Sequence, residues 1–190
     1  ANINVVIDGA GYGFSGTFKL NGNKRINMAE TLTIKNVNFY TYDEAHDFIT
    51  YAVKASNVHN LLVEDCTFTG PEYQTAVRCV VIRSANKVTV RNCTATNVFN
   101  LVQNVSGSKN ITVEGCTVDA MYGVNLGNAG GTNIVNNNTI NASTGYAVNM
   151  MSGNKGTASL EGNTVENGFV RVENTSANEL TVTITSDNVI

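Results

Sequence analysis

A short segment that recurs along the whole chain constrains its fold more than any other feature of the sequence. The clearest copies begin at residues 32, 61, 88, 111, 133 and 158 and read LTIKNVNF, LLVEDCTF, VTVRNCTA, ITVEGCTV, NIVNNNTI and ASLEGNTV. A degenerate copy, VVIDGAGY, begins at residue 5, and a blurred copy, LTVTITSDNVI, begins at residue 180. The spacing of the copies can be measured between their second apolar residues, which run from Ile7 and Ile34 to Leu160 and Val182. Successive copies lie 22 to 29 residues apart. This period is typical of a solenoid.

Each copy alternates apolar and polar residues and then reaches a residue that tolerates left-handed backbone. These residues are Asn36, Asp65, Asn92, Gly115, Asn137 and Gly162. Asn or Gly at this position permits a sharp corner between two short strands at low steric cost. Two columns that should point inward follow the corner: Val37, Cys66, Cys93, Cys116, Asn138 and Asn163, then Phe39, Phe68, Ala95, Val118, Ile140 and Val165. A second apolar patch in each copy supplies the remaining wall.

We therefore predict an all-β fold, a right-handed single-stranded parallel β-helix of about seven to eight coils with three short strands per coil. Equivalent strands would stack about 4.8 Å apart, and the right hand follows from the usual chirality of parallel crossovers. A leucine-rich repeat would need a Leu/Asn consensus that is absent. A β-sandwich would give like residues no reason to recur at one position per copy.

The 190 residues form a single predicted domain, 1–190. Neither end shows a polar capping repeat, and an uncapped solenoid exposes sheet edges. We therefore expect a module or fragment of a longer chain, or one that associates end to end or as a homo-oligomer.

The charge pattern bears on the expected partners. The chain carries 12 Lys and Arg against 15 Asp and Glu, a net charge of −3, and has no basic run. Nucleic acids and anionic membranes normally require concentrated positive charge, so neither is an expected partner. No apolar stretch approaches the roughly 20 residues that a membrane-spanning helix needs, and no signal peptide is visible at Ala1.

In its coil spacing and its Asn/Gly corner, nearly the whole chain resembles the pectin-lyase-like superfamily of right-handed parallel β-helices. Many members of that superfamily are secreted polysaccharide lyases or hydrolases, and others are adhesin shafts, phage tailspikes or surface modules. The resemblance implies an extracellular or cell-surface, bacterial protein. The superfamily's catalytic patterns are missing: the chain has no Asp-Asp pair, no acidic column across several coils, and no Arg followed two residues later by Lys.

The candidate site lies in the two longest coils, where segments 40–47 and 69–75 follow the same strand position. These loops should lie side by side, and solenoids commonly place insertions on their binding face. No other region combines a histidine, several carboxylates and exposed aromatic residues. The candidate ligand-binding residues are Tyr40, Tyr42, Asp43, Glu44, His46, Asp47, Glu72, Tyr73 and Arg78.

Two functions remain open from the sequence. The first is a non-catalytic secreted or surface module, adhesin-like or a structural shaft of the fibre or tailspike type, that binds a glycan or a protein partner. The second is a polysaccharide lyase or glycoside hydrolase acting on an acidic polysaccharide. Its catalytic residues would come from His46, Arg78, Arg83 and Tyr73. The missing catalytic patterns and the short solenoid favour the first function.

Four further patterns bear on cofactors and on packing. No cofactor is expected, although Asp43, Glu44 and Asp47 could hold calcium without forming a recognisable calcium loop. The cysteines lack the spacing of a zinc site and are expected to be buried free thiols. The column Lys35, Glu64, Arg91 and Glu114 alternates in sign and predicts a salt-bridge ladder. An aromatic column is expected to stack inside the solenoid: Phe48, Phe99, Tyr122, Tyr146 and Phe169.

Overall fold

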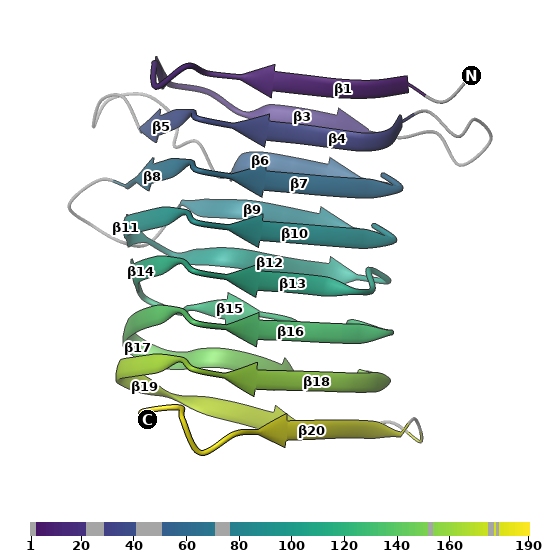
Figure 1. Cartoon of the computed structure of the whole chain (residues 1–190), viewed down its shortest axis with the longest axis vertical. Helices are drawn as coiled ribbons and strands as arrows, with labels where there is room; N and C mark the ends of the chain where they lie inside the picture. The colour runs from purple at the N-terminus through teal and green to yellow at the C-terminus, as the bar shows by residue number, and fades with distance from the viewer. Residues whose placement is uncertain are drawn as a thin grey trace.

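The computed structural model of the protein describes residues 3–21, 29–40, 51–70, 77–151, 154–174, 177 and 179–190. Their regular structure consists of β-strands, and the strand pairs are parallel. Among these residues there is no helix long and apolar enough to cross a membrane. Figure 1 shows the strands stacked level upon level, with β1 and β20 at opposite ends of the solenoid. The predicted parallel β-helix is confirmed.

The first sheet contains one strand from each level. It has eight strands in the order β1-β4-β7-β10-β13-β16-β18-β20. Their bounds are Ile3–Asp8 (β1), Ala29–Lys35 (β4), Asn60–Glu64 (β7), Lys87–Arg91 (β10), Ile111–Glu114 (β13), Thr132–Asn136 (β16), Gly156–Glu161 (β18) and Leu180–Ile184 (β20).

The second sheet forms the other two walls of the solenoid. Its order is β2-β5-β8-β11-β14-β17-β15-β12-β9-β6-β3, and β19 pairs with β17. The long strand β17 belongs to both walls, so the sheet runs along one wall and returns along the other. Its strands are Gly13–Phe14 (β2), Phe18–Asn21 (β3), Asn38–Tyr40 (β5), Tyr51–Ser56 (β6), Thr67–Thr69 (β8), Arg78–Arg83 (β9), Thr94–Val98 (β11), Asn100–Ser106 (β12), Thr117–Ala120 (β14), Val124–Asn125 (β15), Thr139–Met151 (β17) and Thr164–Glu173 (β19).

The corner residues adopt the backbone that the repeat predicts. Their φ angles lie between 52° and 63° for Asn36, Asp65, Asn92, Gly115, Asn137 and Gly162. The second apolar positions pair in register from Ile7 and Ile34 through Val135 and Leu160. Residues some two dozen apart in the sequence are therefore direct neighbours in space.

The core consists of the two predicted inward columns and the apolar patches that face them. Both columns are buried from end to end. Phe39 and Phe68 stack with ring centroids 5.0 Å apart. Cys66, Cys79, Cys93 and Cys116 are buried free thiols, as predicted.

Ion pairs link neighbouring coils on the outside of the first sheet. Arg91 contacts Glu64 at 2.6 Å, as the alternating column predicts. Lys35, however, pairs with Asp8 of the preceding coil, at 3.2 Å.

The last copy differs from the prediction in its register. Ile184, and not Val182, lies beside Leu160, because β20 is displaced by two residues relative to the aligned repeat. A two-residue slip keeps every side chain on the same face of the sheet, so the alternation of the sequence does not discriminate between the two registers. The coil count also differs slightly, since β20 has no second-sheet strand after it among the described residues, only a bridge from Val189 to Thr164.

Candidate functional site

Most residues of the predicted loop site lie outside the described residues. They are Tyr42, Asp43, Glu44, His46, Asp47, Glu72 and Tyr73, which include all three calcium candidates. The two segments do begin side by side, because Tyr40 pairs with Thr69 in register. The structure describes three of the candidates: Tyr40, Arg78 and Arg83.

Tyr40 and Arg78 line two different depressions of the described surface. Tyr40 ends β5, is 40% exposed, and borders a shallow depression of about 10 Å³ with Phe39, Phe68 and Thr69. Arg78 begins β9 and lines a different and much larger groove.

This groove has a volume of about 350 Å³ and lies on the outer face of β6, β9 and β12. Parallel pairing places these three strands on successive levels, with Lys54 beside Val81 and Val81 beside Gln103. The lining residues are Tyr51, Lys54, Ala55 and Ser56 from β6, Arg78, Val81, Ile82 and Arg83 from β9, and Gln103 and Val105 from β12. Arg78 and Arg83 thus lie in one site, together with Lys54, which the repeat did not single out.

The groove is positively charged. Lys54, Arg78 and Arg83 line it, and none of the acidic residues that the structure describes does. The ion pairs within the described part of the chain use other cations, namely Lys35, Arg91 and Arg171. The three groove cations therefore have no carboxylate partner among the described residues.

Aromatic rings hold two of these cations in place. The Arg78 guanidinium lies over the ring of Phe99, 4.2 Å from its centroid. The Lys54 ammonium lies over the ring of Tyr51 at 4.6 Å. A cation over an aromatic face is attracted to the ring and keeps its charge. Both groups are thus positioned at the groove before any ligand binds.

The lining of the groove is mixed, with both polar and apolar surface. Val81 is 4% exposed, and Ala55 and Ile82 are fully buried. Gln103 adds an amide whose Oε1 has no hydrogen-bond partner. A concave surface on which several polar groups converge is a candidate ligand site.

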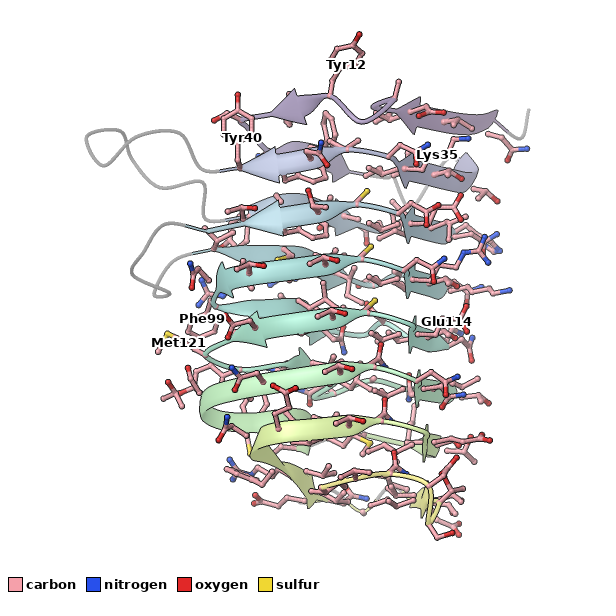
Figure 2. The ribbon with its side chains drawn as sticks, turned by 60° about the vertical axis from the view of Figure 1, so that its left-hand side comes forward. Tyr12, Lys35, Tyr40, Phe99, Glu114 and Met121 are labelled. Carbon is pink, nitrogen blue, oxygen red and sulfur yellow. The ribbon has the colours of Figure 1, made fainter. Side chains whose placement is uncertain are left out.

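The aromatic column next to the groove corrects a sequence prediction. Phe99, Tyr122 and Tyr146 are half-buried, not enclosed, and Phe169 is 51% exposed. Ring centroids lie 5.1 Å apart between Phe99 and Tyr122 and 4.7 Å apart between Tyr122 and Tyr146. Phe99 and Tyr122 lie between strands, where the chain turns from one wall to the next, so strand alternation does not determine their direction. Figure 2 shows Phe99 at this corner of the ribbon. Phe48 lies outside the described residues.

The described groove contains no histidine, carboxylate or thiol that could act as a general acid, base or nucleophile. Across the described ranges, no three His, Cys, Asp or Glu side chains are placed to hold a metal ion. The chemistry that this arrangement supports directly is the binding of an anion.

The sequence places the three groove cations next to the second apolar patch of two successive copies. Lys54 follows an apolar run in one copy, and Arg78 and Arg83 flank an apolar run in the next. Only the register, with Tyr51 beside Arg78 and Ser56 beside Arg83, shows that these charges meet on one outer face.

Comparison with known proteins gives one match. The family model of the right-handed beta helix region matches residues 20–189. No curated protein and no solved structure matches the chain.

Proposed function

The chain belongs to the right-handed β-helix family, and on that premise we propose that it is a non-catalytic module that binds an acidic glycan in the groove over β6, β9 and β12. As a secreted or surface-displayed module it would act as an adhesin-like domain or as a rigid shaft. The fold itself serves many functions, so the proposal depends on the groove.

One observation carries the proposal: three cations line the groove, and among the described lining residues there is no carboxylate. Guanidinium groups present a planar set of donors that matches a carboxylate or sulfate group. Because Arg78 and Lys54 are already held over aromatic rings, less side-chain freedom is lost when an anion binds.

The remaining surface points to an anionic sugar chain more than to nucleic acid or a neutral glycan. Nucleic-acid binding draws on many phosphate contacts, and the chain as a whole has a net charge of −3. Neutral glycans usually stack on exposed aromatic faces. Here Phe99, Tyr122 and Tyr146 pack against one another at interplanar angles of 53° and 33°, so they do not present one flat aromatic platform.

The test is a binding titration with polygalacturonate, beside a neutral dextran of similar length. We expect polygalacturonate to bind and dextran not to bind. Arg78→Gln should weaken binding about tenfold or more, because it removes a charge-assisted hydrogen bond. Arg171→Gln is the matched control on the same wall and should bind as the wild type does, since Arg171 is paired with Glu173 at 2.6 Å.

The same titration separates the two functions that the sequence left open. Absorbance of an unsaturated product, or release of reducing ends, that disappears in Arg78→Gln or Arg83→Gln would replace the binding proposal with a lyase or hydrolase. Equal binding of dextran and polygalacturonate would also contradict the proposal. Thermal unfolding of each variant shows whether a loss of binding comes from loss of the fold.

A further inference from the structure

The groove has a direction, and on the basis of the proposed glycan binding we infer that the sugar chain lies across the solenoid, along strand β9, and not along the stack of coils. Three observations support this orientation: the shape of the groove, the placement of its charges, and the wall formed by a β-bulge in β12.

The groove is longer along the strand than along the solenoid axis. Its lining includes both the first and the last residue of β9, Arg78 and Arg83, but only one neighbouring strand on each side. Five residue steps of about 3.3 Å give a length of about 17 Å, or roughly four sugar rings, whereas two strand spacings give only about 10 Å. An extended chain therefore fits best parallel to β9.

The charges lie at the two ends of this long dimension. Arg78 marks one end, and Lys54 adds to it because its ammonium lies over Tyr51, which pairs with Arg78. Arg83 marks the other end, beside Ser56. Val81 and Ala55 lie between the two ends and carry no charge. A ligand that uses all three cations must reach from one end of β9 to the other.

A β-bulge closes the side of the groove toward the later coils. The pairing of β12 with β9 shifts between Asn104 and Ser106, and the extra residue, Val105, is 37% exposed and lines the groove. Bulges of this kind re-aim a side chain. Here the bulge places an apolar side chain on the edge that a ligand running along the axis would have to pass.

Beyond this bulge, the side-chain N–H of Asn149 and the side-chain oxygen of Asn125 on the same face are already engaged, while Oδ1 of Asn149 is buried. Asn149 donates to Asn125 at 3.2 Å, and Asn125 also accepts from the backbone N–H of Gly127 at 3.0 Å. The next cation in this row, Arg171, is paired with Glu173. Toward the later coils, a path along the axis therefore offers a sugar chain few donors and no uncommitted charge among the described residues. Toward the earlier coils the next cation is the exposed Lys19, which pairs with Lys54 in register but lies outside the lining of the groove.

The orientation predicts a length threshold, which can be measured with galacturonic acid oligomers from the monomer to the octamer by isothermal titration calorimetry. We expect affinity to rise up to about the tetramer, which spans β9, and then to stay level. Arg83→Gln should weaken tetramer binding about tenfold and leave dimer binding nearly unchanged, because the dimer reaches only the Arg78 and Lys54 end. Asn149→Ala is the control and should leave both affinities as they are.

The outcomes distinguish this inference from the proposed function. Affinity that keeps rising to the octamer, or that falls in Asn149→Ala, would overturn the crosswise orientation while leaving glycan binding intact. Equal effects of Arg83→Gln on dimer and tetramer would also overturn it. If neither polygalacturonate nor any oligomer binds, the proposed function itself fails.

Discussion

At the scale of single residues, the first inward column after the corner forms its buried hydrogen bonds with two kinds of side chain, thiols and amides. In the earlier coils Cys66, Cys93 and Cys116 occupy it, and each thiol donates to the carbonyl two residues before it at 3.2 to 3.3 Å. In the later coils asparagines replace them. Asn163 donates to Val135 O at 2.6 Å, and its Oδ1 accepts from the N–H and the side-chain amide of Asn138. A buried amide is stable there because its polar atoms have partners.

The hydrogen bonds between Asn138 and Asn163, called here the asparagine ladder, give the first stability prediction. Asn163→Ala should lower the free energy of unfolding by about 2–4 kcal/mol, because it leaves the buried backbone N–H of Asn138 without its acceptor and removes one of the two acceptors of its side-chain amide. Asn167→Ala is the control, since it removes an exposed side-chain bond to Asn141 of 2.8 Å and should cost less than about 0.5 kcal/mol. Urea unfolding of the three proteins measures the difference. An equal loss of unfolding free energy in both variants would contradict a larger stabilising contribution from the buried asparagine ladder.

At the scale of elements, hydrogen bonds between neighbouring coils fix a spacing that leaves no room for a side chain at certain corners. Gly123 joins β14 to β15. Its N–H donates to Tyr146 O at 2.9 Å, and its carbonyl accepts from Leu101 N–H at 3.1 Å. A Cβ at this position would collide with the carbonyl oxygen of Ala147 and lie 2.8 Å from Cγ2 of Ile140. The close approach of β15 and β17 therefore depends on glycine.

We predict that Gly123→Ala lowers the free energy of unfolding by about 1–3 kcal/mol, because overpacking forces the two coils apart. Gly130→Ala is the matched control. Its Cβ would meet only the side chains of Lys109 and Lys155, at 3.7 Å, so it should be neutral or stabilise by up to about 1 kcal/mol. Thermal unfolding of both variants and of the wild type measures these changes in stability. A loss in Gly130→Ala as large as that in Gly123→Ala would contradict this account.

At the scale of the whole molecule, the solenoid encloses one continuous core, in which all four thiols are at most 1% exposed. Burial raises the pKa of the Cys79 thiol well above its usual value, and the nearby Cys116 contributes in the same direction. Cys79 comes from β9 and Cys116 follows β13, so the two walls meet across a narrow interior.

This burial makes stability depend on pH in a defined direction. Below the unfolded pKa, near 9.0, Cys79 is protonated in both states and its contribution to stability is fully present. Above that pH the unfolded chain releases the proton while the folded protein keeps it, so stability falls as pH rises. We expect the urea midpoint to drop more steeply between about pH 8 and 10 in the wild type than in Cys79→Ala. Identical slopes would contradict the buried-thiol account, because lysines and tyrosines titrate equally in both proteins.

The proposed site was only partly predictable from the sequence. Arg78 and Arg83 were candidates because they lie near long loops, but Lys54 was not, and Tyr40 proved to border a different depression. A groove requires several side chains to meet on one face. Lys54 and Arg83 come from different coils, and only the parallel register of β6 and β9 places them in the same groove.

The sequence by itself determined the local geometry: the corners at Asn36, Asn92 and Gly115, the inward columns, and hence the parallel β-helix. These features follow from backbone preferences and from the two-residue alternation of strands, which are properties of neighbouring residues. Only the tertiary structure decided the two-residue slip of β20, the outward position of the aromatic column, and the joining of three cations in one groove. Each of these depends on how coils pack against one another, and alternation along a strand does not specify that packing.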